Sequence, residues 1–466
     1  MISQKTRASL TVIISSIIVL FGTVLLVAVA SGYNIDIFNG EISTRGLVKL
    51  NTNPAGATIK LNSKIIKQKT PYQLDSVKIG PITIEYEKEG YHKWSSKFLV
   101  EGGVVTFADY ALLIPNEIET KNIDATLVYN DFLSNTDHSK LYVVSENTGL
   151  IQEVQRNSQI KKIAELPQNA SFKPASKLTE NITNEEGSAI VTKAIYPDSK
   201  PVRFWVGVSN GAAVNIDEII GEETRNIIIN PKNNKEIFGI NNGQLIKSNV
   251  DSRLTTKLGP TNINSLAIDK SFIYTLENLT PQSNGQFLVR YDFNGGGRYV
   301  VAQYPASTVA WQIVLSRLNN TEYLAITNPV DGSTYVISND GQKILSSFIG
   351  TGIKYIGFNK TGRFLSYSQA NNFKSIDLEY TERFYVQNEG IGGLAWFTDY
   401  QLVINKADGP YIVDYSGDNL IKLPPNINNN ATFKLNFTSD NKTIYFINAG
   451  KISYYSLQPK SSLINF

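Results

Sequence analysis

Phe358–Tyr367, FNKTGRFLSY, is the clearest copy of a pattern that the chain repeats: a bulky apolar residue, a short polar turn, then an apolar strand. Later copies follow at spacings of roughly 40 residues, the period of a four-stranded propeller blade. The other copies begin at or lie near Asp137, Tyr196, Ile229, Asp269, Asn319, Trp396 and Phe437. Each blade of a propeller is a sheet with two apolar faces buried against its neighbours. The repeat therefore predicts a seven- or eight-bladed β-propeller over residues 123–466.

A second repeated feature is an aspartate at the end of a later strand. Asp292, Asp377 and Asp414 each follow an apolar strand and precede a polar turn, where the carboxylate can accept hydrogen bonds from the next backbone amides. The turn pattern resembles that of Tol-type and WD-like propellers, although no strict Trp-Asp or Gly-His signature occurs. The resemblance implies a shared architecture and no particular activity.

Residues 46–115 read as a small β-sandwich. Apolar residues alternate with polar ones along short segments, as in Val48 and Leu50 and again in Ile82, Ile84 and Tyr86. A period of two marks strands with one buried face. Turn residues separate the segments, so we expect a compact β-module ahead of the propeller.

Four motifs of this module resemble the PEGA domain family. They are Pro54-Ala-Gly-Ala57, Asn62-Ser-Lys64, Thr70-Pro71 and Gly90-Tyr91. The family has Glu where this chain has Ala55, so any role of that carboxylate is in doubt, but the turn itself depends on the proline and glycine. The resemblance implies a small extracytoplasmic β-module, often membrane-tethered, with a binding or spacer role at bacterial surfaces.

The apolar stretch Leu10–Ala30 carries no charge and reaches about 30 Å as a helix, the hydrocarbon thickness of a bilayer. Lys5 and Arg7 precede it, which predicts a cytoplasmic N-terminus and an extracytoplasmic remainder. The alternative is a signal peptide cleaved after Ala30, since Ala-Val-Ala fits a cleavage site, but the stretch is long for one. The expected order is a cytoplasmic tail (1–9), a transmembrane helix (10–31), a stalk (32–45), the PEGA-like β-domain (46–115), a linker (116–122) and the β-propeller (123–466).

The composition of the 466 residues excludes several classes of site. The net charge of +3 argues against a nucleic-acid partner, and the absence of cysteine excludes disulfides and thiolate chemistry. His92 and His138 are the only histidines, and His138 has no Gly-x-Ser-x-Gly elbow to form a triad with. Asn294–Arg298 is glycine-rich without the lysine and helix of a phosphate loop. We expect no cofactor, no metal and no catalytic residue.

Two groups of residues are candidate ligand contacts. A lysine cluster in the PEGA-like module could face anionic cell-wall polymers or lipid headgroups, although lysines also protect exposed strand edges from aggregation. Tryptophans could stack on a sugar or face the propeller channel, although core packing is the favoured interpretation; Trp396, in the repeat itself, is expected to pack between blades. The candidates are Lys60, Lys64, Lys67, Lys69, Trp94, Trp205 and Trp311.

The favoured function is non-enzymatic: a single-pass, membrane-anchored binding or scaffold protein of the bacterial cell envelope that recognises cell-wall glycan or a protein partner. The alternatives are an exported propeller hydrolase acting on glycans or peptides, because fold alone does not exclude one, and a structural spacer with a large apolar face. Three or more carboxylates or tyrosine hydroxyls converging at a channel mouth would favour the hydrolase. A lining of serine, asparagine and threonine would argue against it.

Overall fold

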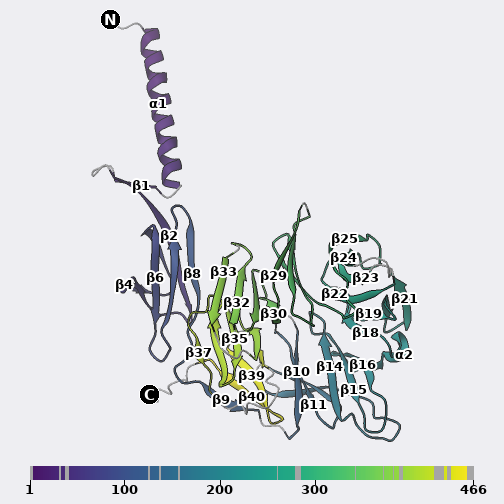
Figure 1. The fold of residues 1–466 in the computed structure, drawn as a ribbon. Coiled ribbons are helices and arrows are strands. Elements are labelled where there is room, and N and C mark those ends of the chain that lie inside the picture. The colour runs from purple at the N-terminus through teal and green to yellow at the C-terminus, as the bar shows by residue number, and fades with distance from the viewer. Residues whose placement is uncertain are drawn as a thin grey trace. The chain divides into compact units, whose positions relative to one another are not determined.

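The computed structural model describes residues 4–30, 33–36, 41–123, 126–135, 138–155, 158–259, 261–278, 285–341, 343–370, 372–380, 382–387, 392–424, 435–437 and 442–458. The chain divides into two compact units, Met1–Glu117 and Ile118–Phe466. Almost all regular structure is β-strand, as Figure 1 shows. The predicted mainly-β fold is therefore confirmed.

The N-terminal segment forms helix α1 (Gln4–Ala30). Its described large side chains, from Val12 to Val27, are apolar and largely exposed. Within the described residues, no helix meets the length and hydropathy required to cross a bilayer.

The first unit also contains a β-sandwich of two four-stranded sheets. In one sheet, β2 pairs antiparallel with β1 and β5 and parallel with β8. The other sheet has the order β4-β3-β6-β7. The strands are β1 (Tyr33–Asp36), β2 (Glu41–Asn53), β3 (Thr58–Leu61), β4 (Lys64–Lys69), β5 (Tyr72–Lys78), β6 (Gly80–Glu87), β7 (Trp94–Val100) and β8 (Val105–Leu112).

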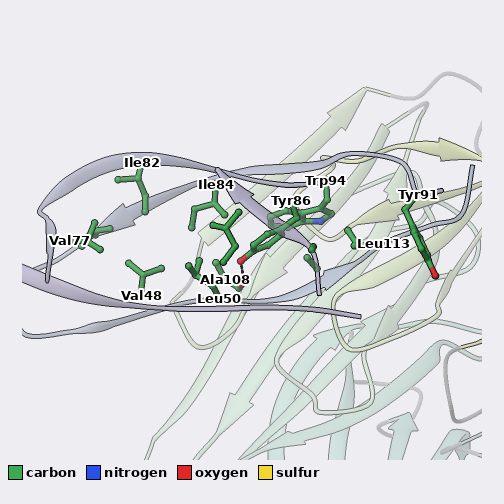
Figure 2. Close-up of a cluster of buried hydrophobic side chains, with 14 residues drawn as sticks. Val48, Leu50, Val77, Ile82, Ile84, Tyr86, Tyr91, Trp94, Ala108 and Leu113 are labelled. Atoms are coloured by element: carbon green, nitrogen blue, oxygen red, sulfur yellow. Dashed lines mark hydrogen bonds between the residues drawn. The ribbon is translucent and has the colours of Figure 1, made fainter. Parts of the chain in front are cut away.

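The core of this sandwich is apolar and aromatic. Figure 2 shows Trp94 lying against Tyr86 between the sheets, with the two ring centroids 5.2 Å apart. The Tyr86 hydroxyl donates a hydrogen bond of 2.5 Å to the carbonyl of Ala108, so its polar end is satisfied inside the core. Burial of this hydroxyl raises the pKa of Tyr86. The alternation read from the sequence thus corresponds to the inward face of each strand.

The motif turns hold the two sheets together at one end. The Thr70 hydroxyl lies 2.7 Å from the hydroxyl of Thr52 and accepts a hydrogen bond of 3.0 Å from the amide of Ala57. The amide of Gly56 donates to the carbonyl of Thr70 at 2.8 Å, and the φ of Gly56 is +87°, which favours glycine. These contacts explain why a Pro-Ala-Gly-Ala turn and a Thr-Pro pair occur in one motif set.

The second unit contains eight four-stranded antiparallel sheets within its described residues. The first four are β10 (Tyr129–Ser134), β11 (Leu141–Ser145), β12 (Leu150–Val154), β13 (Ile160–Glu165); β14 (Lys177–Thr183), β15 (Ala189–Ile195), β16 (Val202–Gly207), β17 (Ala213–Asn215); β18 (Arg225–Ile229), β19 (Glu236–Asn241), β20 (Gln244–Asn249), β21 (Leu254–Leu258); and β22 (Ile263–Ile268), β23 (Ile273–Asn278), β24 (Gly285–Tyr291), β25 (Tyr299–Pro305). A single helical turn, α2 (Asp217–Ile220), follows β17.

In the next three sheets, as in the first four, consecutive strands of the sequence are neighbours. The last sheet departs from this order. They are β26 (Gln312–Leu318), β27 (Thr321–Thr327), β28 (Thr334–Asn339), β29 (Ile344–Gly350); β30 (Ile353–Phe358), β31 (Phe364–Gln369), β32 (Asn372–Asp377), β33 (Glu382–Gln387); and β34 (Gly393–Trp396), β35 (Gln401–Lys406), β36 (Gly409–Asp414), β37 (Ile421–Lys422). The last sheet is β38 (Leu435–Phe437), β39 (Thr443–Asn448) and β40 (Lys451–Ser456), completed by β9 (Glu119–Asn122).

Strand β9 corrects the prediction of a linker at 116–122. Its residues pair antiparallel with β40, with Asn122 opposite Ser453 and Glu119 opposite Ser456. In Figure 1 the blue β9 accordingly lies beside the yellow β39 and β40. The segment is polar because it is an outer strand, and its partner lies at the far end of the sequence. The two ends of the unit are thus joined in one sheet.

The sheets pack face to face in sequence order. The first strand of each sheet contacts the first strand of the next from β10 through β34, and β10 also contacts β38. Buried clusters fill the interfaces between sheets, for example Leu133 and Tyr142 of the first sheet with Leu178 and Phe204 of the second. Central strands are buried on both faces, which explains continuous apolar runs such as Leu141–Val144 of β11. This region is a β-propeller.

One repeat copy was predicted in the wrong register. Tyr196 follows β15, a second strand, whereas Ile229, Phe358 and Trp396 end first strands. The equivalent turn of that sheet begins at Asn184. The spacing from Asn184 to Gly187 equals the spacing from Asn359 to Gly362, and in both turns the glycine amide donates to the asparagine carbonyl.

Candidate functional site

A cavity of about 810 Å³ opens where the first strands of the propeller end. Its described lining comes from the C-terminal halves of the first strands, or from the turns that follow them, in the seven sheets that begin with β10, β14, β18, β22, β26, β30 and β34. The polar and charged members of the lining are His138, Thr183, Asn184, Glu185, Asp269, Lys270, Ser271, Ser316, Arg317, Asn359, Lys360, Thr398 and Asp399. This cavity is the channel mouth, and we use that name below.

Asparagines build the turns around the channel mouth and connect neighbouring sheets. The Asn359 side chain accepts a hydrogen bond from the amide of Phe364 at 2.9 Å and donates to the carbonyl of Asp399 in the next sheet at 3.0 Å. Asn135 does the same with the amide of Lys140 and the carbonyl of Glu185. The first bond closes each turn and the second fixes its position relative to the following sheet. The turns of the channel mouth are therefore held in fixed positions by asparagines for which the sequence alone indicated only a place in a turn.

Ion pairs across the channel mouth neutralise most of its charge. Lys270 lies 2.7 Å from the Glu185 carboxylate, which raises the lysine pKa, and this pair joins turns of two sheets that are not neighbours in sequence. Arg317 lies 3.4 Å from Asp269 and 2.7 Å from the buried carboxylate of Glu322, which fixes the guanidinium. The mouth thus has paired cations and carboxylates surrounded by hydroxyl and amide groups.

Asp399 is the exception among these carboxylates. Its Oδ1 is buried and has no hydrogen-bond partner among the described residues. Burial raises the pKa of Asp399, while Lys360 opposes that shift. Asp399 thus adds to the lining a partly buried carboxyl group whose neutral form is favoured by burial.

Trp396 contributes an aromatic side chain to the lining. Its indole N–H donates to the carbonyl of Gly357 at 3.0 Å, and its ring is stacked on Phe364 with centroids 6.0 Å apart. The prediction that Trp396 packs between sheets is confirmed. The half-buried ring also lines the channel mouth, which the sequence interpretation did not assign to it.

The three tryptophans proposed as ligand contacts are buried. Trp94 lies in the core of the sandwich. Trp205 is on β16, a third strand, where it is 1 % exposed and donates to the carbonyl of Asn234 at 2.8 Å. Trp311 precedes β26 and packs against Tyr304 and Tyr335. None of them is in the described lining of the channel mouth, so the favoured interpretation of core packing holds for all three and the alternative of a ligand contact does not.

The four candidate lysines have different surroundings. Lys60 pairs with Glu87 at 2.7 Å. Lys64, Lys67 and Lys69 are exposed along β4, the edge strand of its sheet. The three edge lysines are thus accessible, and both the ligand and the edge-protection interpretations remain for them.

Two of the three predicted capping aspartates, Asp292 and Asp377, accept bonds from backbone amides as predicted, whereas the Asp414 carboxylate accepts hydrogen bonds from the side-chain amides of Gln401 and Asn419. Asp292 accepts hydrogen bonds of 2.8 Å from the amides of Asn294 and Gly296, and Asp377 accepts one of 3.0 Å from the amide of Glu379. The glycine-rich Asn294–Arg298 segment is the hairpin between β24 and β25. His138 lies at the rim with its Nδ1 3.0 Å from the Ser134 hydroxyl. Among the described residues, no three His, Cys, Asp or Glu side chains gather in a way that could hold a metal ion.

The lining meets the criterion for a hydrolase in number and also contains the polar residues that argue against one. Three carboxylates converge on the channel mouth, but Glu185 and Asp269 are paired with cations. Serine, threonine and asparagine supply much of the remaining polar lining, and no described lining residue is a tyrosine. The mouth suits a polar ligand with hydroxyl, amide and carboxylate groups.

Comparison with known proteins identifies one part of the chain by its sequence. Residues 45–113 match the family model of the PEGA domain. No curated protein is a significant match to the chain.

Solved structures similar to the chain include propellers. The Dos1 propeller has 12% identity and a TM-score of 0.47, covering 73% of this chain and 95% of its own. An oligogalacturonate lyase in complex with manganese has 12% identity and a TM-score of 0.41, covering 73% and 98%. A eukaryotic initiation factor has 10% identity and a TM-score of 0.47, covering 72% and 86%. Residues 45–113 are thus a PEGA domain by the family match, and the β-propeller region that follows is assigned from its own sheets.

Proposed function

We propose that this chain is a membrane-anchored, extracytoplasmic binding protein of the cell envelope, without enzymatic activity, that holds cell-wall glycan in the channel mouth. The observation that carries the proposal is the channel mouth itself, a cavity of about 810 Å³ with side chains from seven sheets. Cavities of this size accommodate an oligosaccharide or a short peptide. Glycan strands present hydroxyl, acetamido and carboxylate groups, and the lining offers partners for each.

The scaffold supports such a role. We take each four-stranded sheet as one blade, which makes an eight-bladed propeller whose last blade contains β9 from the start of the unit. Joining the two ends in one blade keeps the turns around the mouth in fixed positions. A preorganised site loses less conformational entropy when a ligand binds.

The membrane anchor in this proposal rests on the N-terminal sequence. Leu10–Ala30 has no charged residue, and the described large side chains of α1 are exposed. Lys5 and Arg7 precede the stretch, and positive residues are retained in the cytoplasm. The proposed orientation puts the PEGA domain and the propeller outside the cell.

Cosedimentation with isolated peptidoglycan sacculi tests the binding function on the detergent-solubilised full chain. Lys360→Glu reverses a charge beside Asp399 and should lower the affinity about tenfold, which corresponds to about 1.4 kcal/mol. The matched control is Lys161→Glu, an exposed lysine on the outer strand β13. A third variant, Lys67→Glu on β4, tests whether the edge lysines contribute to the affinity for sacculi. Equal affinities for Lys360→Glu and Lys161→Glu would refute binding at the channel mouth.

A second candidate function has one specific observation in its favour. The buried Asp399, with its raised pKa and an unpartnered oxygen, has the properties of a general acid for a hydrolase. Incubation of the chain with soluble glycan or peptide substrates should then give products, and Asp399→Asn should abolish them. An absence of product from the unmodified chain would leave the binding function alone.

A further inference from the structure

We infer that one end of the PEGA domain is a membrane-docking surface that rests on anionic lipid headgroups. Five exposed apolar residues form this surface, which we call the apolar tip: Ile79, Leu99, Val104, Val105 and Phe107. The inference goes beyond glycan binding and rests on the anchoring part of the proposed function.

The apolar tip is exposed by the strand pattern itself. On β7, Phe98 and Val100 point inward, so Leu99 points outward and is 62% exposed. On β8, Ala108 belongs to the core, so Phe107 points outward and is 52% exposed. Outward positions of a sandwich are normally polar, whereas Leu99 and Phe107 place large apolar side chains on the outer faces of both sheets, near the turn that joins β7 to β8.

The pairing registers gather the five residues at one end of the sandwich. Leu99 lies opposite Pro81, two residues after Ile79. Val105 lies beside Leu47, whose amide donates to the carbonyl of Val104 at 3.3 Å. In Figure 2 this is the end at which Val77 and Ile82 lie, away from Tyr91.

Basic residues surround the apolar tip. Arg45 lies opposite Lys78 in the pairing of β2 with β5, and Lys97 is outward on β7 next to Leu99 along the strand. The Lys49 ammonium lies 5.4 Å from the centroid of the Phe107 ring. Glu101 is the one carboxylate in the adjoining β7–β8 turn. Apolar side chains ringed by cations are complementary to the interface of an anionic bilayer.

Chain connectivity indicates a bilayer as the partner. The chain enters the PEGA domain at the apolar tip, because Arg45 near the start of β2 pairs with Lys78 at the end of β5. Tyr33 of β1 lies opposite Thr44 of β2, so only a few residues along the chain separate the end of α1 from a position next to Arg45. An anchored chain therefore holds the tip close to the membrane, where its local concentration at the lipid surface is high.

Site-specific fluorescence tests the inference, since the chain has no cysteine. Leu99→Cys and Phe107→Cys in the full chain are labelled with an environment-sensitive dye and reconstituted in vesicles of phosphatidylcholine and phosphatidylglycerol that contain a lipid-attached quencher. The control label is at His92→Cys, an exposed position at the other end of the domain. We expect at least twofold stronger quenching at both tip positions than at the control, and weaker quenching in vesicles of phosphatidylcholine alone.

The outcomes separate this inference from the anchor on which it rests. Vesicle flotation with equal quenching at the tip and at His92→Cys overturns the docking surface and leaves the anchor in place. A dye shift at the tip without quenching by lipid also overturns it and indicates a protein contact. Failure of the chain to float with vesicles overturns both.

Discussion

Replacing Arg203 by methionine should be among the most destabilising single changes in the propeller. Arg203 lies on β16 with its side chain 8% exposed, and its Nε donates to Asp217 at 2.6 Å. Its terminal nitrogens donate to the carbonyls of Gly221, Glu222 and Thr224, and its backbone amide donates to the second oxygen of Asp217. One side chain therefore fixes α2 and the loop after it to the second sheet.

The expected loss follows from burial. Removing one partner of a buried, hydrogen-bonded ion pair leaves the other charge uncompensated and lowers the free energy of unfolding by about 3–5 kcal/mol. The matched control is Arg253→Met, which breaks the Arg253–Glu218 pair, 2.9 Å long and more than half exposed on both sides. Exposed pairs contribute about 0–1 kcal/mol.

Urea unfolding measured by tryptophan emission distinguishes the two variants, since the buried Trp205 is on the same strand as Arg203. With an m-value of about 3 kcal/mol/M, the midpoint should fall by about 1–1.7 M for Arg203→Met and by no more than about 0.3 M for Arg253→Met. The double variant Arg203→Met/Asp217→Leu should recover part of the loss, because it removes both charges. Equal midpoints for the two single variants would refute the reasoning.

Three further predictions concern the PEGA domain, the closing sheet and the channel mouth. Thr70→Val removes the acceptor for the Ala57 amide and should lower the stability of the PEGA domain by about 1–3 kcal/mol in chemical unfolding, whereas Thr106→Val, at a partly exposed hydroxyl, should change it little. Thr120→Pro in β9 should interrupt pairing with β40 and lower the free energy of unfolding of the propeller by about 1–3 kcal/mol, while Glu117→Pro, outside the strand, should not; equal stability of the two would contradict the closing role of β9. Burial raises the pKa of Asp399 in the folded state. Ionisation of Asp399 therefore opposes folding once the pH rises above the pKa that this carboxyl group has in the unfolded chain. Asp399→Asn should therefore stabilise the propeller at neutral pH, with a gain that disappears below about pH 3.8, and a gain independent of pH would contradict the assignment.

Local features of the fold could be predicted from the sequence. The turn after Phe358 and the cap at Asp292 depend on side chains that bond to the next few amides, so a short segment contains all the information. The same holds for the Pro54–Ala57 turn, whose conformation follows from its proline and glycine. The alternation of Ile82, Ile84 and Tyr86 likewise gave the correct inward face.

Features that depend on distant residues could not be predicted. Whether Trp205 faces the channel depends on which strand of its sheet it occupies. Because the repeat pattern takes Tyr196 as the end of a first strand, it assigns Trp205 to the wrong strand of the sheet. Glu119–Asn122 has no apolar pattern because its partner is β40. Nothing local in the sequence indicates that Lys270 pairs with Glu185, or that Oδ1 of Asp399 has no hydrogen-bond partner among the described residues. The repeat indicated the turns of the channel mouth, while its charge arrangement required the three-dimensional structure.

Tryptophan fluorescence during titration with soluble peptidoglycan fragments tests the central claim most directly. Trp396 lines the channel mouth, whereas Trp94, Trp205 and Trp311 are buried elsewhere. The account predicts a saturable change in the emission of the unmodified chain that is lost in Trp396→Phe, a variant that keeps an aromatic ring against Phe364. An equal change in both proteins, or none in the unmodified chain, would contradict ligand binding at the channel mouth.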